Sequence, residues 1–264
     1  MGIKYFQDKT IWITGASSGI GEGFARALSE AGAYVILSSR REKVLQEIQS
    51  QLAFPNRSKV VTIDMEDNNS IDAACEMINN EFQIDMVILN AGISQRSRIL
   101  DTEFQTEQRI MQTNFIGAAR LTKLILPKMV EKQKGHFVVL SSVTGKIGVP
   151  TRSMYSASKH ALHGYFDSLR AELTDSGIFV TILCPGYVYT NISKNAVLGD
   201  GAPQNSIDEN SKNGMLVDTF VEKALKGIAK KKQEMLIGGK ETMGVVIKRF
   251  FPSLLNNIIK KVNA

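Results

Sequence analysis

Short apolar runs alternate with amphipathic stretches over most of the chain. The apolar runs are rich in β-branched residues, which is typical of buried strands, and they cover residues 9–14, 34–38, 60–63, 86–89, 136–140, 178–183 and 235–237. Between them apolar residues recur at helical spacing, which predicts helices after residue 21 and at 42–53, 70–81, 103–130, 154–175 and 216–230. The alternation predicts an α/β fold of the Rossmann type: a doubly wound, mostly parallel seven-stranded sheet with helices on both faces. No repeat or linker divides residues 1–264, so we expect a single domain.

One internal segment departs from this alternation. Residues 193–214 are polar and rich in Gly and Asn. A loop of this length inside a compact domain is more often functional than idle. We therefore expect a mobile lid over the substrate.

The C-terminal tail, residues 240–264, is a second distinct segment. Within it, basic residues alternate with apolar ones over residues 245–261, and Pro252 would interrupt any single helix there. Two interpretations stay open. The favoured one packs the tail on a neighbouring subunit or near the substrate mouth; the other gives it peripheral contact with an anionic membrane surface.

Composition fits one large globular domain, since 43% of the 264 residues are apolar. No apolar run approaches the roughly 20 residues that span a bilayer, and residues 1–7 are too short and polar for a signal peptide. Cys75 and Cys184 lie in apolar patterns without a pairing or metal-binding spacing, so both are predicted core residues and no metal is expected. We expect a reducing, cytoplasmic setting.

The net charge of +6 is concentrated in the last part of the chain. Residues 1–222 carry 22 Lys and Arg against 24 Asp and Glu, whereas residues 223–264 carry 10 against 2. A basic tail does not form a groove across the fold, so no nucleic-acid partner is expected.

The first predicted strand runs into a glycine-rich turn, Gly15-Ala-Ser-Ser-Gly-Ile-Gly21, and a helix follows. A turn in this place is a dinucleotide phosphate site, because free backbone N–H groups at the helix N-terminus receive the pyrophosphate. Gly15 allows the tight turn, and the later glycines let backbone and cofactor approach closely. The predicted cofactor contacts here are Gly15, Ser17, Ser18, Gly19, Ile20 and Gly21.

The second strand ends at Ser39-Arg40, where many dinucleotide-binding folds place an acidic residue on the ribose of NAD. None is present here, and Arg40 can pair with a 2′-phosphate, which favours NADP over NAD. The alternative is that Arg40 is a solvated loop charge. After the third strand, Asp64 and Met65 are predicted to border the adenine.

Three polar residues suggest proton transfer. Tyr155 and Lys159 are four residues apart and share a helical face, and the ammonium is expected to lower the pKa of the phenol from about 10. Ser142 ends the preceding strand, where its hydroxyl can hydrogen-bond a carbonyl beside the phenol. Asn114 is unfavourable within a helix. It is either a satisfied polar residue or a main-chain break that holds a water near Lys159.

Five motifs in this order resemble the short-chain dehydrogenase/reductase family over residues 8–190. They are Thr14–Gly21, Asn90-Ala91-Gly92, Asn114, Ser142 with Tyr155–Lys159, and Pro185-Gly186. Within the family, residues 152–160 and 185–191 resemble the dehydrogenase/reductase member 7 proteins, which are relatives of the 11-beta-hydroxysteroid dehydrogenases.

The resemblance implies roles at the matching positions. Tyr155 would be the general acid/base and Ser142 would orient the carbonyl. Lys159 would lower the pKa of Tyr155 and hold the ribose, and Asn114 would anchor a proton-relay water. The implied ribose and nicotinamide contacts are Asn90, Ala91, Gly92, Tyr155, Lys159, Pro185, Gly186, Val188 and Thr190.

The expected substrate site is mostly apolar, and its predicted lining is Ser142, Val143, Thr144, Val149, Tyr155 and Tyr187. We therefore expect an NADP(H)-dependent oxidoreductase that interconverts a carbonyl and a secondary or primary alcohol on an apolar small molecule. The resemblance also implies a homodimer or homotetramer. The alternative function is a catalytically silent nucleotide-binding sensor or scaffold.

Overall fold

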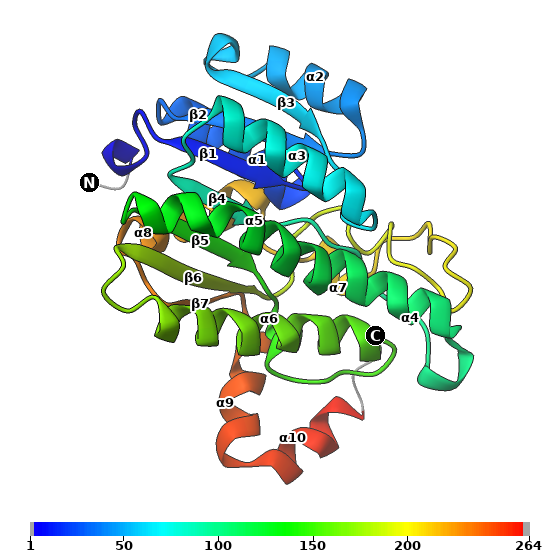
Figure 1. Ribbon diagram of the computed structural model, residues 1–264. Coiled ribbons are helices and arrows are strands. Elements are labelled where there is room, and N and C mark those ends of the chain that lie inside the picture. Colours follow the sequence, from blue (N-terminus) through cyan, green and yellow to red (C-terminus); the bar gives the residue numbers. More distant parts are fainter. Residues whose placement is uncertain (1–2, 261–264) are drawn as a thin grey trace.

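The computed structural model describes residues 3–260 (Figure 1). The first two residues of the chain, and residues 261–264 of the predicted tail, lie outside the described part. Seven strands form one sheet, in the order β3-β2-β1-β4-β5-β6-β7, and all six neighbouring pairs are parallel. The strands are β1 Thr10–Thr14, β2 Tyr34–Ser39, β3 Ser58–Thr62, β4 Met86–Leu89, β5 Gly135–Leu140, β6 Ile178–Pro185 and β7 Glu234–Ile237. The predicted Rossmann-type sheet is confirmed.

Helices cover both faces of the sheet. The helices are α1 Gly19–Glu30, α2 Glu42–Ser50, α3 Asn68–Glu81, α4 Phe104–Met111, α5 Gly117–Glu131, α6 Ser153–Glu172, α7 Glu209–Lys212, α8 Val217–Ala229, α9 Met243–Phe250 and α10 Pro252–Ile259. One apolar core packs under α1, α2 and α8, and the other under α3, α5 and α6. Alternate side chains of β1 pack into the two cores: Ile11 and Ile13 into the first, and Trp12 into the second. Burial on both faces explains why the five inner strands are continuous apolar runs, whereas the edge strands β3 and β7 are partly exposed.

The order of the strands positions the functional site. β1 pairs with β2 on one side and with β4 on the other. The chain therefore turns in opposite directions after these neighbouring strands, and a crevice opens at their carboxyl ends. The glycine turn follows β1, and Asn90 follows β4, so both predicted motifs lie at this crevice.

The long helix predicted at 103–130 is interrupted. α4 and α5 are joined by one π-helical turn, Gln112–Ile116, which contains the buried Asn114. A π turn adds a residue to the helical repeat and commonly occurs at functional sites. The main-chain break considered for Asn114 is therefore present.

The described part of the tail forms two short helices, α9 and α10, which are joined at Phe251 and meet at an angle (Figure 1); together we call them the C-terminal hairpin. Pro252 begins α10, where its missing N–H costs no hydrogen bond. The hairpin projects beyond the sheet on the side of α6 (Figure 1), and Ile247 and Leu255 pack against Val143 and Ile147. Within residues 3–260, every helix is too short or too polar to span a lipid bilayer.

Candidate active site

Two adjoining cavities open at the carboxyl ends of the strands. The first, of about 540 Å³, lies over the glycine turn and the ends of β2, β3 and β4. The second, of about 350 Å³, lies between the end of β5, the start of α6, the end of β6 and the C-terminal hairpin. Ile192 lines both cavities. A molecule in the first cavity can therefore meet one in the second.

Close packing shapes the glycine turn. Gly15 has φ +67°, and a Cβ at Gly21 would lie 2.2 Å from the Gly15 carbonyl oxygen. The side chain of Asn90 donates to the carbonyl oxygens of Thr14 and Gly15, at 3.0 and 3.1 Å. Gly21 was predicted to contact the cofactor, but it does not line the cavity. Its missing side chain instead lets the turn pack against itself and against the end of β4.

Most other predicted cofactor contacts line the first cavity. They are Gly15, Ser17, Ser18, Gly19, Ile20, Ser39, Arg40, Asp64, Met65, Asn90, Ala91, Gly92 and Thr190. Three others, Pro185, Gly186 and Val188, lie at the end of β6 or just after it and line the second cavity instead, whereas Thr190, further along the same loop, reaches the first.

Basic residues border the far end of the first cavity. Arg40 lies 3.2 Å from a carboxylate oxygen of Glu66 and 3.9 Å from one of Asp64. Arg41, which the sequence reasoning did not select, donates to the hydroxyl and carbonyl oxygens of Ser17 at 2.8 and 3.0 Å. Its guanidinium therefore ties the end of β2 to the glycine turn. The adjacent Arg-Arg pair was the available signal in the sequence.

Asn114 is held by three hydrogen bonds. Its Oδ1 accepts from the backbone N of Ile93 at 2.8 Å, and its Nδ2 donates to the Ile93 carbonyl at 2.9 Å and to Ser158 Oγ at 3.0 Å. A Cβ at Gly92 would lie 3.0 Å from Asn114 Oδ1 and 3.4 Å from Lys159 Nζ. The π turn thus places the amide against the loop after β4, on the side where Lys159 ends.

Tyr155 and Lys159 lie on one face of α6, both buried. Lys159 Nζ is 5.8 Å from the centroid of the Tyr155 ring and donates to the Leu140 carbonyl at 2.7 Å. Burial lowers the pKa of Lys159 to about 8.

The pKa of Tyr155 is raised from its usual value. Burial is the largest cause, and Arg152, the Ser142 hydroxyl and Arg96 oppose it. The predicted net lowering of this pKa by Lys159 is therefore wrong, because the cost of desolvating a phenolate exceeds the favourable interactions around it.

Polar contacts position the Ser142 hydroxyl and the first turn of α6, which carries Tyr155. Ser142 Oγ accepts hydrogen bonds from the backbone N and the hydroxyl of Thr144, at 3.1 and 3.0 Å. Gln95, fully buried in the loop after β4, accepts from the backbone N of Met154 at 2.9 Å and of Tyr155 at 3.2 Å. The Gln95 amide therefore caps the first turn of α6. The sequence offered no signal for this contact across 60 residues.

Every predicted substrate residue lines the second cavity: Ser142, Val143, Thr144, Val149, Tyr155 and Tyr187. The sequence reasoning missed the opposite wall, which the hairpin supplies with Met243, Gly244, Ile247, Leu255, Ile258 and Ile259. The favoured interpretation of the tail included a position near the substrate mouth, and the described part of the tail occupies it.

Two buried arginines also line this cavity. Arg96 Nε lies 3.0 Å from Asp208 Oδ2, and Arg152 Nη2 lies 3.4 Å from the same oxygen. Burial acts to raise the pKa of Asp208, but hydrogen bonds from Arg96 and Gln204 produce a net lowering. Asp208 belongs to segment 193–214, so this ion pair ties the predicted lid to the start of α6.

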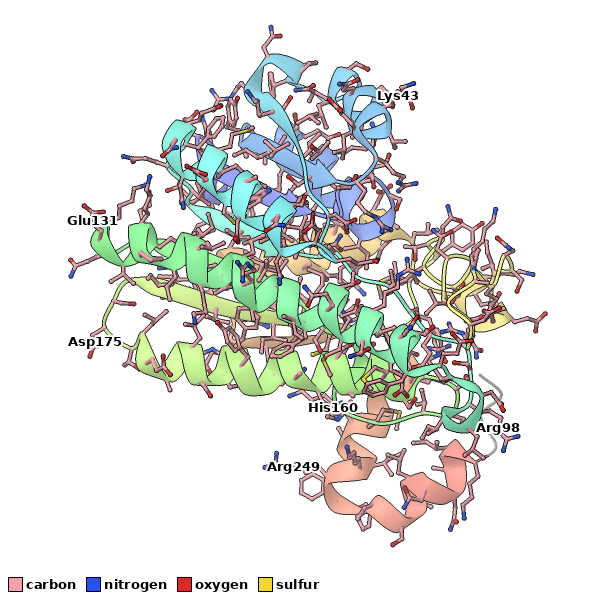
Figure 2. The ribbon with its side chains drawn as sticks, turned by 45° about the vertical axis from the view of Figure 1, so that its right-hand side comes forward. Lys43, Arg98, Glu131, His160, Asp175 and Arg249 are labelled. Carbon is pink, nitrogen blue, oxygen red and sulfur yellow. The ribbon has the colours of Figure 1, made fainter. Side chains whose placement is uncertain are left out.

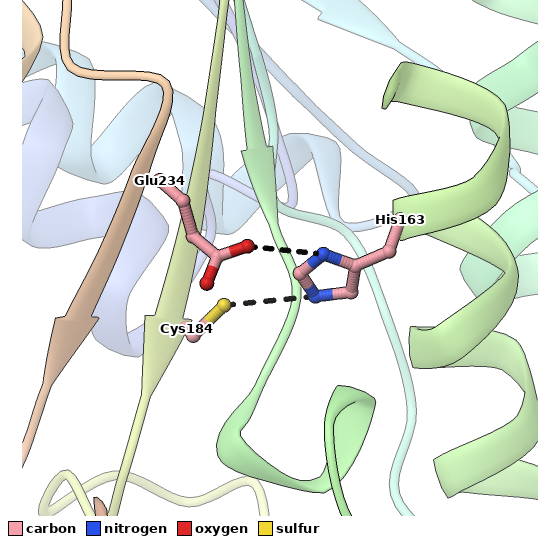
Figure 3. A group of neighbouring side chains, drawn as sticks. All are labelled: His163, Cys184 and Glu234. Atoms are coloured by element: carbon pink, nitrogen blue, oxygen red, sulfur yellow. Dashed lines mark hydrogen bonds and ion pairs between the residues drawn. The ribbon is translucent and has the colours of Figure 1, made fainter. Parts of the chain in front are cut away.

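A polar cluster of His163, Cys184 and Glu234 lies between α6 and the strands β6 and β7 (Figure 3). His163 Nε2 is 3.0 Å from Ser141 Oγ and 3.6 Å from Cys184 Sγ, and its Nδ1 is 3.5 Å from Glu234. Burial lowers the pKa of His163 to about 4 and raises that of Cys184 to about 12. The cluster is therefore a neutral imidazole and thiol beside one carboxylate. Because Cys184 and Glu234 face different ring nitrogens, they do not converge on one cation.

These features define a class of protein. An all-parallel doubly wound sheet, a glycine turn at its crevice and a Tyr–Lys pair beside the adjoining cavity are the arrangement of a dinucleotide-dependent oxidoreductase.

The sequence comparison identifies the family. The family described as short chain dehydrogenase matches residues 9–200. The rat protein named dehydrogenase/reductase SDR family member 7B is 40% identical over 97% of this chain and 81% of its own length. A Drosophila melanogaster protein named dehydrogenase/reductase SDR family protein 7-like is 36% identical over 96% of this chain and 80% of its own length. The chain belongs to the short-chain dehydrogenase/reductase family and is an NAD(P)-dependent oxidoreductase.

Solved structures show the same fold. A short-chain dehydrogenase from Streptomyces avermitilis superposes with a TM-score of 0.82 and 26% identity, over 97% of this chain and 98% of that one. A short-chain dehydrogenase from Sphingobium yanoikuyae in complex with NADPH has a TM-score of 0.79 and 23% identity, and the match covers 97% of this chain and 96% of that one. A short-chain dehydrogenase/reductase from Burkholderia phymatum in complex with NAD has a TM-score of 0.82 and 22% identity, and the match covers 94% of this chain and 95% of that one.

Proposed function

We propose that the protein uses NADP(H) to interconvert a carbonyl and a secondary or primary alcohol on a mostly apolar small molecule. The observation that carries this proposal is that Ser142 and Tyr155 both line a cavity of about 350 Å³ with largely aliphatic walls. Such a cavity suits an apolar ligand whose single polar group meets the two hydroxyls.

The two hydroxyls divide the chemistry at the substrate oxygen. In the reductive direction Tyr155 donates a proton to that oxygen, and Ser142 donates a hydrogen bond that stabilises its developing negative charge. The nicotinamide, when bound, supplies the hydride. In the oxidative direction Tyr155 accepts the proton of the alcohol.

Lys159 and Asn114 act behind Tyr155. The ammonium group, 5.8 Å from the phenol ring centroid, favours the phenolate that is left after proton transfer. Asn114 holds the loop after β4 against α6 through Ile93 and Ser158. We propose that its π turn also holds the water that returns a proton to Lys159.

The preference for NADP(H) over NAD rests on Arg40 and Arg41. Both guanidinium groups border the end of the first cavity that follows β2. Glu66 already accepts a hydrogen bond from Arg40, whereas Arg41 donates only to uncharged oxygens. A 2′-phosphate would supply the anionic partner that Arg41 lacks within the described residues.

Segment 193–214 is proposed to act as the lid. It carries Asp208 onto Arg96 and Arg152 beside the second cavity. A closed lid would exclude water from the two hydroxyls, which strengthens their interaction with the substrate oxygen.

The test is a panel of aldehydes, ketones and secondary alcohols, with turnover followed by NADPH fluorescence and repeated with NADH. We expect turnover of apolar carbonyl compounds with NADPH at several times the rate with NADH. A preference for NADH would contradict the assignment of Arg40 and Arg41. No consumption of either nucleotide across the panel would favour a nucleotide-binding scaffold instead.

A further inference from the structure

The C-terminal hairpin has an outer apolar face as well as an inner one. Val246 and Phe250 lie four residues apart on α9 and share one face; they are 56% and 64% exposed and line neither cavity. Phe251, at the start of α10, and Leu254, three residues further on, are 63% and 51% exposed and also lie away from the cavities.

Two apolar stripes on one short helix pair are unusual for a surface element. A surface helix normally turns its single apolar stripe to the core, and here Ile247 and Leu255 already do so. Isolated exposed apolar residues need no explanation, but a contiguous exposed patch marks a docking surface. The outer face is therefore a surface that another body covers.

The hairpin segment carries a positive net charge. Residues 240–260 contain Lys240, Lys248, Arg249 and Lys260 but only one acidic residue, Glu241. Lys240 lines the substrate cavity and Lys248 donates to the Lys146 carbonyl, whereas Arg249 and Lys260 are exposed. The Glu241 carboxylate accepts hydrogen bonds from the backbone N of Tyr187 and of Gly239, so it is turned into the domain. Figure 2 shows Arg249 on the hairpin, at the opposite end of the molecule from Lys43.

We infer that the outer face of the C-terminal hairpin docks on an anionic lipid surface. Apolar side chains flanked by Lys and Arg are what such a surface binds, through burial of the former and attraction of the latter. A second copy of the chain fits less well. Self-complementary pairing of this small face would bring its own basic residues together without acidic partners.

The docking surface and the substrate cavity share one element. Ile247 and Leu255 line the cavity from the inner side of the hairpin, while Phe250 and Phe251 lie on its outer side. If the proposed reaction is correct, an apolar substrate passes between the bilayer and Tyr155 past the hairpin. The lipid contact itself does not depend on that reaction.

The test is co-sedimentation of the full chain with liposomes of phosphatidylcholine, alone or mixed with phosphatidylserine. We expect the protein to pellet with the mixed liposomes and to stay in solution with neutral ones. Phe250→Ser with Phe251→Ser should lower the partition coefficient at least about tenfold, because two exposed aromatic side chains no longer enter the interface. Phe54→Ser with Met77→Ser, a pair exposed by 47% and 44% elsewhere, should leave it unchanged.

A charge variant tests the same surface without altering its apolar residues. Arg249→Gln with Lys260→Gln should weaken pelleting about fivefold for each charge removed, and Lys43→Gln with Lys123→Gln should not. Melting curves and NADPH binding show whether each variant is folded. Tyr155→Phe should pellet like the wild type, so failure of the reaction and failure of docking can be distinguished.

Three results would overturn the inference. One is equal pelleting of the wild type and the Phe250/Phe251 variant. Another is equal pelleting of the wild type with neutral and anionic liposomes. The third is a wild-type protein that never pellets but sediments as a dimer in the ultracentrifuge, with the Phe250/Phe251 variant sedimenting as a monomer; the face would then bind a second copy.

Discussion

The two cavities of this protein are built in different ways. The nucleotide cavity is assembled mainly from the turns that directly follow β1 to β4, with α4, the π turn and residues 190–203 completing its wall. The substrate cavity combines residues from Ser94 to Ile259, and its outer wall is a hairpin from the end of the chain. The nucleotide cavity therefore depends mainly on local turns, whereas the substrate cavity depends on contacts between distant segments.

The difference has an energetic counterpart. The nucleotide cavity rests on the central strands, and close packing leaves no room for even one added atom at Gly21. The hairpin is attached to the domain by a small separate apolar cluster, whose fully buried members are Val143, Ile147 and Leu255. The hairpin and its cavity wall can therefore be altered without disturbing the nucleotide site. The four predictions below test that independence.

The largest effect is expected at the proposed proton donor. Tyr155→Phe should lower kcat by about 10²–10⁴-fold, because positioned proton transfer contributes that much to such reactions. The dissociation constant for NADPH, measured by fluorescence, should change little. Tyr189→Phe, at a half-exposed Tyr that lines neither cavity, is the matched control. Near-normal turnover by Tyr155→Phe would refute its role.

Lys159 should make stability depend on pH. Its pKa is about 8 in the folded protein, against its ordinary value of 10.5 in an unfolded chain. Between these values the unfolded chain binds more protons than the folded protein, so this residue makes the free energy of unfolding rise with pH from about 8 to 10.5. Lys159→Met should remove up to about 3 kcal/mol of that rise.

Chemical denaturation at several pH values measures this contribution. The exposed Lys123→Met variant is the control and should keep the wild-type slope. If Lys159→Met and Lys123→Met show the same pH dependence, Lys159 is not the residue that burial perturbs.

The hairpin should affect the substrate side alone. Leu255→Ala removes a buried side chain that also lines the cavity, which should cost about 2 kcal/mol of stability and raise KM for apolar substrates. Affinity for NADPH should stay unchanged. Leu254→Ala, at the 51% exposed neighbouring position, should have neither effect. A parallel loss of NADPH binding in Leu255→Ala would show that the two cavities are not independent.

The smallest effect is expected at the nucleotide end. Arg41→Ala should weaken NADPH binding about tenfold relative to NADH, because one charge-assisted contact to the 2′-phosphate is lost. Lys43→Ala, at an exposed residue two positions further on, should leave the ratio unchanged. An equal loss of affinity for both nucleotides would assign Arg41 to support of the glycine turn through Ser17 rather than to cofactor selection.

Local pattern was sufficient for the fold and for much of the site. Short apolar runs predicted all seven strands, and the signal was strongest in the five inner strands because these are buried on both faces. The glycine turn, Asn90 and the Tyr155–Lys159 pair were predicted at the crevice because each directly follows a strand or shares one helical face.

Other features depended on contacts between distant segments. Gln95 caps α6 across 60 residues, and Asp208 meets Arg96 across 112; neither spacing has a local pattern. The pKa of Tyr155 moved opposite to the expectation because burial, which the sequence does not report, outweighed neighbouring charges.

The sequence alone therefore determined which elements form and which motifs sit at the strand ends, since both follow from short-range spacing. Only the tertiary structure decided how the tail folds back, which of its faces closes the cavity and which is left exposed. The physical reason is that a helix with apolar residues on two faces does not encode which of the two the domain will bury.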